Sequence, residues 1–216
     1  MNWILRVTGT ILIWITSFSC IGQNNDLLFH HLRVQDGLSQ ATNWFTYKDS
    51  RGFIWISSLS GLNRFDGTHI KLFTPDISDP SSIFGENIQS NFYEDRDSNI
   101  WFSTADGINK YNWDHDCFDH YQLTDSEGTA KIGYYIFHLD TFQNIWFLQD
   151  GIDLYTYHIP TGQYSFIDSI TPYSNRCDVV VNVSGKVSKI LLRGPGRTNI
   201  HAIDVQPDFT LGKEST

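Results

Sequence analysis

The sequence is short of cysteine, of positive charge and of long apolar runs, and each shortage excludes a class of protein. Three cysteines in 216 residues do not make a disulfide framework. Cys117 and Cys177 lie beyond the N-terminal segment at an uninformative spacing, so we expect two unrelated thiols, although an oxidising compartment would allow them to pair. Fifteen Lys and Arg against 24 Asp and Glu give a net charge of −9, which excludes an electrostatic footprint for nucleic acid or an anionic membrane surface.

Charged residues are scarce as well, at 18% of the chain. That fraction, beside 40% hydrophobic residues, excludes a disordered chain and a long charged helix, and it leaves enough apolar surface for one domain of ordinary size. Aromatic residues reach 15%, which favours β-structure because aromatic side chains pack well on pleated sheets.

The longest apolar run, residues 7–18, is too short to span a bilayer as a stable helix. Arg6 precedes it and small or polar residues follow it, which is the layout of a secretory signal peptide over residues 1–22. We therefore expect a periplasmic or otherwise exported protein. An uncleaved membrane anchor stays open as an alternative, and so does lipidation of Cys20, although Phe18 fits a lipoprotein cleavage box poorly.

The feature that is abundant is a repeat. Trp55, Trp101 and Trp146 follow one another at intervals of 46 and 45 residues, each between an acidic turn and a later glycine. Each interval contains four short apolar stretches separated by turn residues. A period of this size with four strands in each unit predicts the blades of a β-propeller. The fold class is therefore all-β.

Four blades of four antiparallel strands are predicted, and they occupy residues 41–79, 86–125, 131–170 and 177–212 of a propeller segment that spans 23–216. The last unit is the weakest, because Ser188 stands where the others have tryptophan. Residues 27–36 resemble the outer strand at the end of the second unit and predict an outer closing strand ahead of the first blade. Since the fourth unit has its own outer strand at 208–212, we expect an incomplete, open propeller, with four blades closing on themselves as the alternative.

Turn geometry and packing explain the repeated residues without any chemistry. The aspartate (Asp49 in the first unit) accepts hydrogen bonds from the amides of a tight turn, and Gly52 tolerates the unusual dihedrals of that turn. The tryptophan on the next strand fills the gap between neighbouring blades.

The stretches "DSRGFIWISSLSGLNRFDG" (49–67) and "DSNIWFSTADGINKYN" (97–112) resemble the two-component regulator propeller repeat. The resemblance covers residues 27–158 well and 178–212 less well. It implies the extracytoplasmic sensor region of a hybrid two-component regulator, of a kind often tuned to breakdown products of polysaccharides. The kinase, receiver and DNA-binding parts of such regulators are not among these 216 residues, so the resemblance implies a truncated or partial member.

No catalytic constellation, metal site or cofactor site is predicted, and we expect a non-enzymatic protein. The spacing of His115, Cys117 and His120 fits no zinc pattern and reads as a turn leading into an outer strand, while residues 193–199 read as a surface loop. An oligosaccharide is the expected ligand, and open blade edges predict self-association. Aromatic residues typical of sugar sites are plentiful, but blade packing accounts for most of them, so no binding residue is assigned: Trp44, Trp113, Tyr134 and Tyr135. The alternative function is an independent exported propeller that binds a glycan or a protein without signalling.

Overall fold

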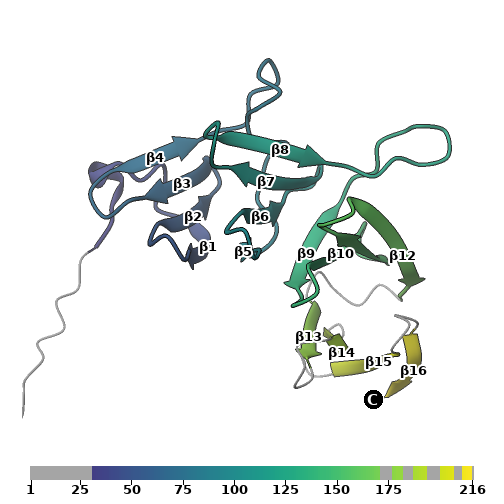
Figure 1. The fold of residues 1–216 in the computed structure, drawn as a ribbon. Helices are drawn as coiled ribbons and strands as arrows, with labels where there is room; N and C mark the ends of the chain where they lie inside the picture. The colour runs from purple at the N-terminus through teal and green to yellow at the C-terminus, as the bar shows by residue number, and fades with distance from the viewer. Residues whose placement is uncertain (1–30, 171–176, 182–186, 194–199, 207–210, 216) are drawn as a thin grey trace, which may run out of the picture. The chain divides into compact units, whose positions relative to one another are not determined.

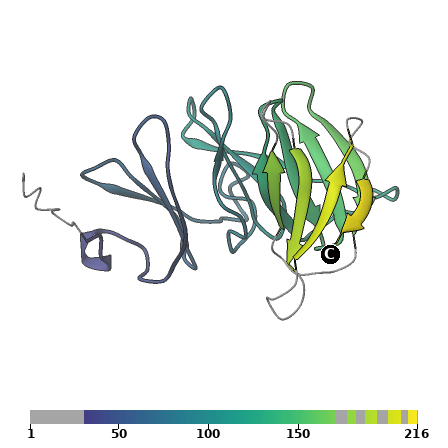
Figure 2. The same cartoon turned by 90° about the horizontal axis from the view of Figure 1, so that it is seen from below.

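The computed structural model describes residues 31–170, 177–181, 187–193, 200–206 and 211–215. Within these residues the chain forms sixteen strands in four separate four-stranded antiparallel sheets, all in the unit Leu32–Thr216. Figures 1 and 2 show that the strands of each sheet lie side by side in chain order. The prediction of an all-β chain built from four-stranded blades is confirmed.

The first two sheets, called blades 1 and 2, precede residue 122. The strands of blade 1 are β1 (Asn43–Lys48), β2 (Ile54–Ser58), β3 (Gly61–Phe65) and β4 (Ile70–Phe73). Those of blade 2 are β5 (Tyr93–Glu94), β6 (Ile100–Ser103), β7 (Ile108–Asn112) and β8 (Cys117–Tyr121).

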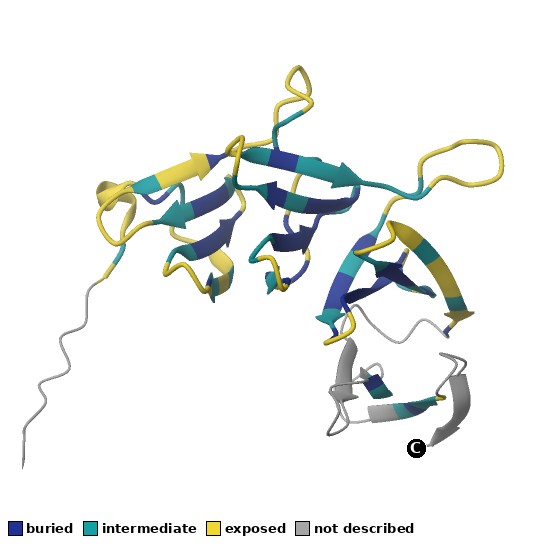
Figure 3. Cartoon of the chain, viewed as in Figure 1, coloured by how far each residue is buried: buried dark blue, intermediate teal, exposed yellow. Residues whose placement is uncertain are grey.

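Blades 3 and 4 follow. The strands of blade 3 are β9 (Tyr134–Leu139), β10 (Asn144–Gln149), β11 (Asp153–His158) and β12 (Gln163–Ser169). Those of blade 4 are β13 (Cys177–Val181), β14 (Val187–Arg193), β15 (Ile200–Val205) and β16 (Leu211–Ser215). Figure 3 shows burial concentrated on the second strands of blades 1 to 3, as expected for strands enclosed within and between sheets.

Two predicted strands differ from the structure. The second blade is predicted to begin at residue 86, but its first strand contains only Tyr93–Glu94, because the Ser90 hydroxyl accepts the hydrogen bond from the Ser103 amide that a longer strand would accept through its backbone. The last strand is Leu211–Ser215 rather than 208–212, of which 208–210 lie outside the described residues.

The predicted closing strand over 27–36 is wrong at its C-terminal end. Val34–Asp36 form a 3₁₀ helix, since the Asp36 carboxylate accepts the Arg33 amide and Gly37 ends the turn at φ 104. Residues 27–30 lie outside the described residues. After the turn, Leu38 is 4% exposed, and the Ser39 amide donates to the Asn63 side chain, which fixes this segment against blade 1.

The acidic turn does more than the sequence suggested. In blade 1 one oxygen of Asp49 accepts the Phe53 amide at 2.8 Å, and the other accepts the Trp55 indole N–H at 2.7 Å. Blades 2 and 3 repeat the indole bond at 2.7 and 2.9 Å, from Trp101 to Asp95 and from Trp146 to Asp140. One carboxylate therefore closes the turn and also orients the tryptophan.

The third residue after each aspartate has a left-handed backbone. Gly52 has φ 96, Ser98 has φ 62 and Gln143 has φ 68. The prediction that the glycine serves unusual dihedrals is confirmed for blade 1, and blades 2 and 3 reach the same conformation without glycine. These two positions carry the strain of a side chain in the left-handed region.

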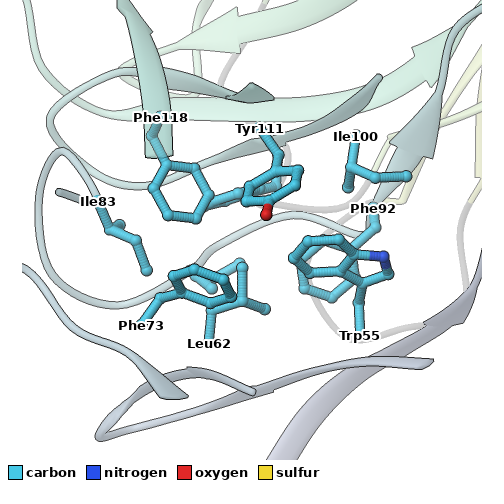
Figure 4. Close-up of a cluster of buried hydrophobic side chains, with 10 residues drawn as sticks. Trp55, Leu62, Phe73, Ile83, Phe92, Ile100, Tyr111 and Phe118 are labelled. Carbon is cyan, nitrogen blue, oxygen red and sulfur yellow. The ribbon is translucent and has the colours of Figure 1, made fainter. Parts of the chain in front are cut away.

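The tryptophans fill the gaps between neighbouring blades, as predicted. Trp55, 0% exposed, belongs to a buried cluster with Tyr111 and Phe118 of blade 2, and Figure 4 shows its indole beside the Tyr111 ring. Trp101 is buried in the same way against Tyr134 and Tyr157 of blade 3. Trp146 packs with buried apolar residues of blade 4, namely Val187, Ile190 and Ile203. Blades 1 to 3 therefore each insert their tryptophan against the blade that follows in the chain.

The weak fourth unit has a structural counterpart. So does the turn of the third unit, where glycine follows tryptophan after five residues, at Gly151, rather than after six, as at Gly61. Ser188 lies where the register of β14 against β13 shifts, between the partners of Val180 and Val181. In blade 3 the β10–β11 turn has Asp150 at φ 53 and Gly151 at φ 69, the two positive values of a tight type I′ hairpin.

Candidate functional site

A cavity of about 250 Å³ opens where the β2–β3 turn of blade 1 meets the connection that leads into blade 2. Ten residues line it: Ser58, Leu59, Ser60 and Gly61 from the turn, and Pro75, Ile83, Gly85, Glu86, Asn87 and Ile88 from the connection. Its volume lies just below the range of about 300–1,000 Å³ that is common for pockets of drug-sized ligands. The cavity is therefore large enough for a small molecule or for one small part of a larger ligand.

Hydrogen bonds within blade 1 hold one wall of the cavity. The Ser58 hydroxyl lies 2.8 Å from the Ser39 hydroxyl, 3.1 Å from the Gly61 carbonyl and 3.2 Å from the Ser60 amide. Gly61 approaches β4 so closely that a Cβ atom there would lie 2.3 Å from the Phe73 carbonyl oxygen. This wall is fixed before any ligand arrives.

Blade 2 holds the opposite wall through Phe84. The Phe84 amide donates to the Asn109 side chain at 2.8 Å, and its carbonyl accepts the Thr104 hydroxyl at 2.6 Å. Gly85, at φ 84, has no room for a side chain, because a Cβ atom would lie 2.3 Å from an oxygen of the Asp106 carboxylate. The residues that follow are thereby placed at the mouth of the cavity.

The cavity has an apolar floor and a polar rim. Ile83 and Ile88 are 3% and 8% exposed, and Figure 4 shows Ile83 among the side chains of the cluster between blades 1 and 2. At the rim, Glu86 and Asn87 are exposed, and Asn87 has a left-handed backbone at φ 56. Their side chains make no hydrogen bond or ion pair with any residue that the structure describes, so both remain available to a ligand.

The equivalent place between blades 2 and 3 is closed by main-chain hydrogen bonds. The Gly133 amide donates to the Ala105 carbonyl, and the Gly133 carbonyl accepts the Asp150 amide at 2.8 Å. The Gln122 side chain adds a bond to the Asp106 carbonyl at 2.9 Å. The cavity is thus a property of the junction between blades 1 and 2 and not of the repeat itself.

The other end of blades 1 and 2 carries charged contacts in place of a cavity. The Glu94 carboxylate accepts the Ser50 amide at 2.9 Å and the Tyr47 hydroxyl at 3.1 Å, both from blade 1. Burial and the Glu94 carboxylate raise the pKa of Tyr47 to about 12. Partial burial opposes ionisation of Glu94, but the hydrogen bonds from Ser50 and Tyr47 outweigh it and lower the pKa of Glu94. These groups join the two blades.

A second group of charged residues joins β3 and β4 of blade 1 to the β7–β8 turn of blade 2. Arg64 of β3 donates to Tyr111 and lies 3.2 Å from Asp116 of blade 2, and Lys71 also pairs with Asp116. Burial, together with the hydrogen bond to Asp116, raises the pKa of Tyr111. The Arg64 guanidinium lies over several aromatic rings, including Trp55 at 5.7 Å. Packing and charge pairing account for all of these side chains.

None of the four aromatic residues weighed from the sequence lines the cavity. Tyr134 is fully buried, and Trp113 and Tyr135 are partly buried against core clusters. Trp44 is 61% exposed on β1. The cavity residues Glu86 and Asn87 were missed, and the only sequence signal for them is the turn-forming run Gly85-Glu86-Asn87.

The acidic, histidine-containing stretch behaves as a turn followed by a strand. Residues 114–116 form the turn, and β8 is the outermost strand of its sheet, as predicted. His120 is bound to the Ser82 carbonyl at 2.6 Å, and Cys117 is a free thiol. Cys177 has a described backbone but its side chain, like residues 194–199, lies outside what the structure describes.

Two further features, a metal-binding cluster and a membrane-spanning helix, are absent from the described residues. No group of three or more His, Cys, Asp or Glu side chains there is arranged to hold a metal ion. Within the same part of the chain, no helix has the length and apolar character needed to cross a membrane.

The chain resembles known proteins in its sequence. Residues 82–106 match the family model described as two component regulator propeller. Histidine kinase P4 of Formosa agariphila is 32% identical over 79 residues, which are 37% of this chain and 6% of that protein.

Solved structures share the fold. The extracellular domain assigned to the hybrid two-component system BT3049 of B. thetaiotaomicron aligns with a TM-score of 0.64 at 21% identity, over 85% of this chain and 26% of that one. The extracellular domain of BT4673, from the same organism, gives 0.62 at 19% identity over 84% and 26%. An auxiliary nutrient binding protein of Bacteroides ovatus gives 0.53 at 10% identity over 79% and 40%. The chain thus spans about a quarter of the two extracellular domains.

The repeated sheets and their inserted tryptophans define a β-propeller architecture of four-stranded blades. Within it, residues 82–106 match the two component regulator propeller family, and the chain has the fold of extracellular domains of two-component systems.

Proposed function

We propose that this chain is an exported, non-enzymatic, ligand-sensing propeller region of the kind that serves two-component regulators, with a glycan-derived ligand. The family match over residues 82–106 is the observation that carries the proposal, because the matching family is named for propellers of two-component regulators. The described part of the chain supports the non-enzymatic part of the proposal. There the repeated aspartates close turns and accept the indole N–H of the repeated tryptophans. The nutrient-binding neighbour from Bacteroides ovatus gives weaker support for a small nutrient as ligand.

Export and binding test this proposal together. The full chain is expressed in a bacterium, and the periplasmic fraction is analysed by mass spectrometry, where loss of roughly the first 22 residues is expected. The exported protein is then melted in the presence of enzymatic hydrolysates of starch, mannan, xylan and pectin. A higher melting temperature with at least one hydrolysate is expected, since a ligand that binds the native state stabilises it. An intact Met1, or no response to any hydrolysate, contradicts the proposal.

A second function has one observation in its favour. This function is that of an exported propeller that binds a protein or a glycan without signalling. Apolar side chains exposed on and beside blade 1 support it, since Val34, Trp44 and Leu72 are 55%, 61% and 43% exposed. Such a surface, with the edge strands of open sheets, also supports self-association. Light scattering across a concentration series should show oligomers that Trp44→Ser diminishes, and a monomer at all concentrations would exclude self-association.

A further inference from the structure

We propose that the cavity between residues 58–61 and 83–88 binds one uncharged sugar unit and excludes acidic sugars. The inference rests on the proposed function and deepens it, because it names a place and a charge class for the ligand. Three observations carry it: the shape of the cavity, the unused polar groups at its rim, and the sign of its charge.

The shape fits one ring with an apolar face and a polar edge. The floor consists of buried Ile83 and Ile88, while exposed Pro75 and hydroxyl, amide and carboxylate groups complete the lining. A sugar ring has the same division, with C–H groups on its faces and hydroxyls around its edge. A volume of about 250 Å³ limits the occupant to a small unit and leaves the rest of an oligosaccharide outside.

The polar groups at the rim suit hydroxyls. A carboxylate such as Glu86 accepts two hydrogen bonds, one from each of two neighbouring hydroxyls, while the Asn87 amide both donates and accepts. Neither side chain makes a hydrogen bond with another described residue, so no protein contact has to break when a ligand binds. The backbone around them is held by the Phe84 and Ser58 hydrogen bonds, which means that little ordering is needed on binding.

The negative charge around the cavity favours uncharged sugars over acidic ones. Glu86 is the one charged residue that lines the cavity, and the Asp106 carboxylate lies against Gly85 at its edge. No Lys, Arg or His is among the ten lining residues. A uronate or sulfate group would therefore meet like charge without a compensating cation, which disfavours binding. An uncharged sugar unit meets no such penalty.

The test uses the full exported chain and defined probes. Saturation-transfer NMR and calorimetry measure binding of maltotriose, cellotriose, xylotriose and mannotriose, with trigalacturonate as the acidic probe. We expect at least one neutral trisaccharide to bind and trigalacturonate to bind more weakly. Glu86→Gln should weaken neutral binding by about tenfold, since a hydrogen bond to a charged group is replaced by a neutral one.

Two further variants keep the result interpretable. Asn87→Gly removes the amide while glycine keeps the left-handed backbone, and it should also weaken binding. Glu127→Gln removes an exposed carboxylate from the turn at 125–128 and should leave binding unchanged, with melting temperatures checking that every variant folds.

The outcomes separate this inference from the proposed function. Neutral binding that survives Glu86→Gln and Asn87→Gly overturns the cavity assignment and leaves a glycan-sensing protein. Tighter binding of trigalacturonate overturns the charge class alone. If no trisaccharide binds while a hydrolysate raises the melting temperature, the inference fails and the proposed function stands. If neither responds, both fail.

Discussion

The junction between blades 1 and 2 and the junction between blades 2 and 3 are built on the same Asp–Trp pair and differ around it. At the first, Arg64 lies over the rings of Phe53, Tyr111 and Trp113 and pairs with Asp116 across the junction. At the second, the matching Lys110 lies 5.9 Å from the Trp101 ring and pairs with Asp119 of its own blade. The first junction is therefore joined by an ion pair as well as by packing. At the second, the Arg96 guanidinium donates to the Thr141 carbonyl, and no ion pair among the described residues crosses the junction.

The loops at the two junctions differ in the same way. Residues 74–92 make a long connection between β4 and β5 and leave a cavity beside the β2–β3 turn. Residues 122–133 make a shorter connection, which bonds directly to the corresponding turn of blade 2 through Gly133. The repeated residues therefore specify how the blades pack, whereas the unrepeated loops specify where a ligand has room.

The largest expected effect comes from removing the inserted tryptophan. Trp101 is 1% exposed at the second junction, so Trp101→Ala should lower the free energy of unfolding by roughly 3–5 kcal/mol, as other large-to-small core changes do. Trp113 stands outside the repeated position and is partly buried, so Trp113→Ala should cost less. Urea titrations followed by circular dichroism compare the two, and equal losses would refute a special role for the repeated position.

A smaller effect distinguishes the charged junction from the other. The Arg64 side chain is 16% exposed and stacks on aromatic rings, so Arg64→Met should cost about 2 kcal/mol, the value of a largely desolvated cation–π contact. Lys110→Met should cost less than about 1 kcal/mol, because Lys110 has a partly exposed ion pair with Asp119 and a more distant ring contact, 5.9 Å from the Trp101 ring. The same urea titrations measure both, and a larger loss for Lys110→Met would reverse the comparison.

The smallest effect is a dependence on pH at the first junction. Because the folded protein lowers the pKa of Glu94 below the ordinary value of 4.5, its contacts stabilise the fold fully above that value and are lost as pH falls through the folded pKa. Wild type should therefore exceed Glu94→Gln in stability near neutral pH, by less than about 1 kcal/mol. Urea midpoints measured from about pH 6 to about pH 3 should converge towards the acid end. A difference that is constant with pH would show that the carboxylate charge plays no part.

Much of the fold could be predicted because its signals are local and recur. The tryptophan period, the apolar stretches and the turn residues define the strands of blades 1 to 3 closely. The short β5 could not be predicted, because it depends on the Ser90 side chain replacing a backbone partner. The turn at Val34–Asp36 could not either, since a local cap by Asp36 overrode the strand-like pattern.

The indole hydrogen bond and the cavity illustrate two kinds of omission. Asp49 and Trp55 lie six residues apart, and the same spacing recurs in the next two units, so the bond could have been found from the sequence. The cavity could not, because it depends on the path of a long connection and on the left-handed backbone at Asn87. Its residues lie in the one part of the unit that the repeat does not specify.

Insertion of each tryptophan into the next blade has a consequence for how such a chain can evolve. The Asp–Trp pair lies within one repeat, whereas the rings that receive the indole, Tyr111 for Trp55 and Tyr157 for Trp101, belong to the following repeat. Tyr111 and Tyr157 lie on the third strands of successive blades, so duplication of a repeat copies both a tryptophan and a ring that can receive the tryptophan of the preceding unit. A substitution at Trp55 or Trp101 is therefore coupled to a ring 56 residues further along the chain.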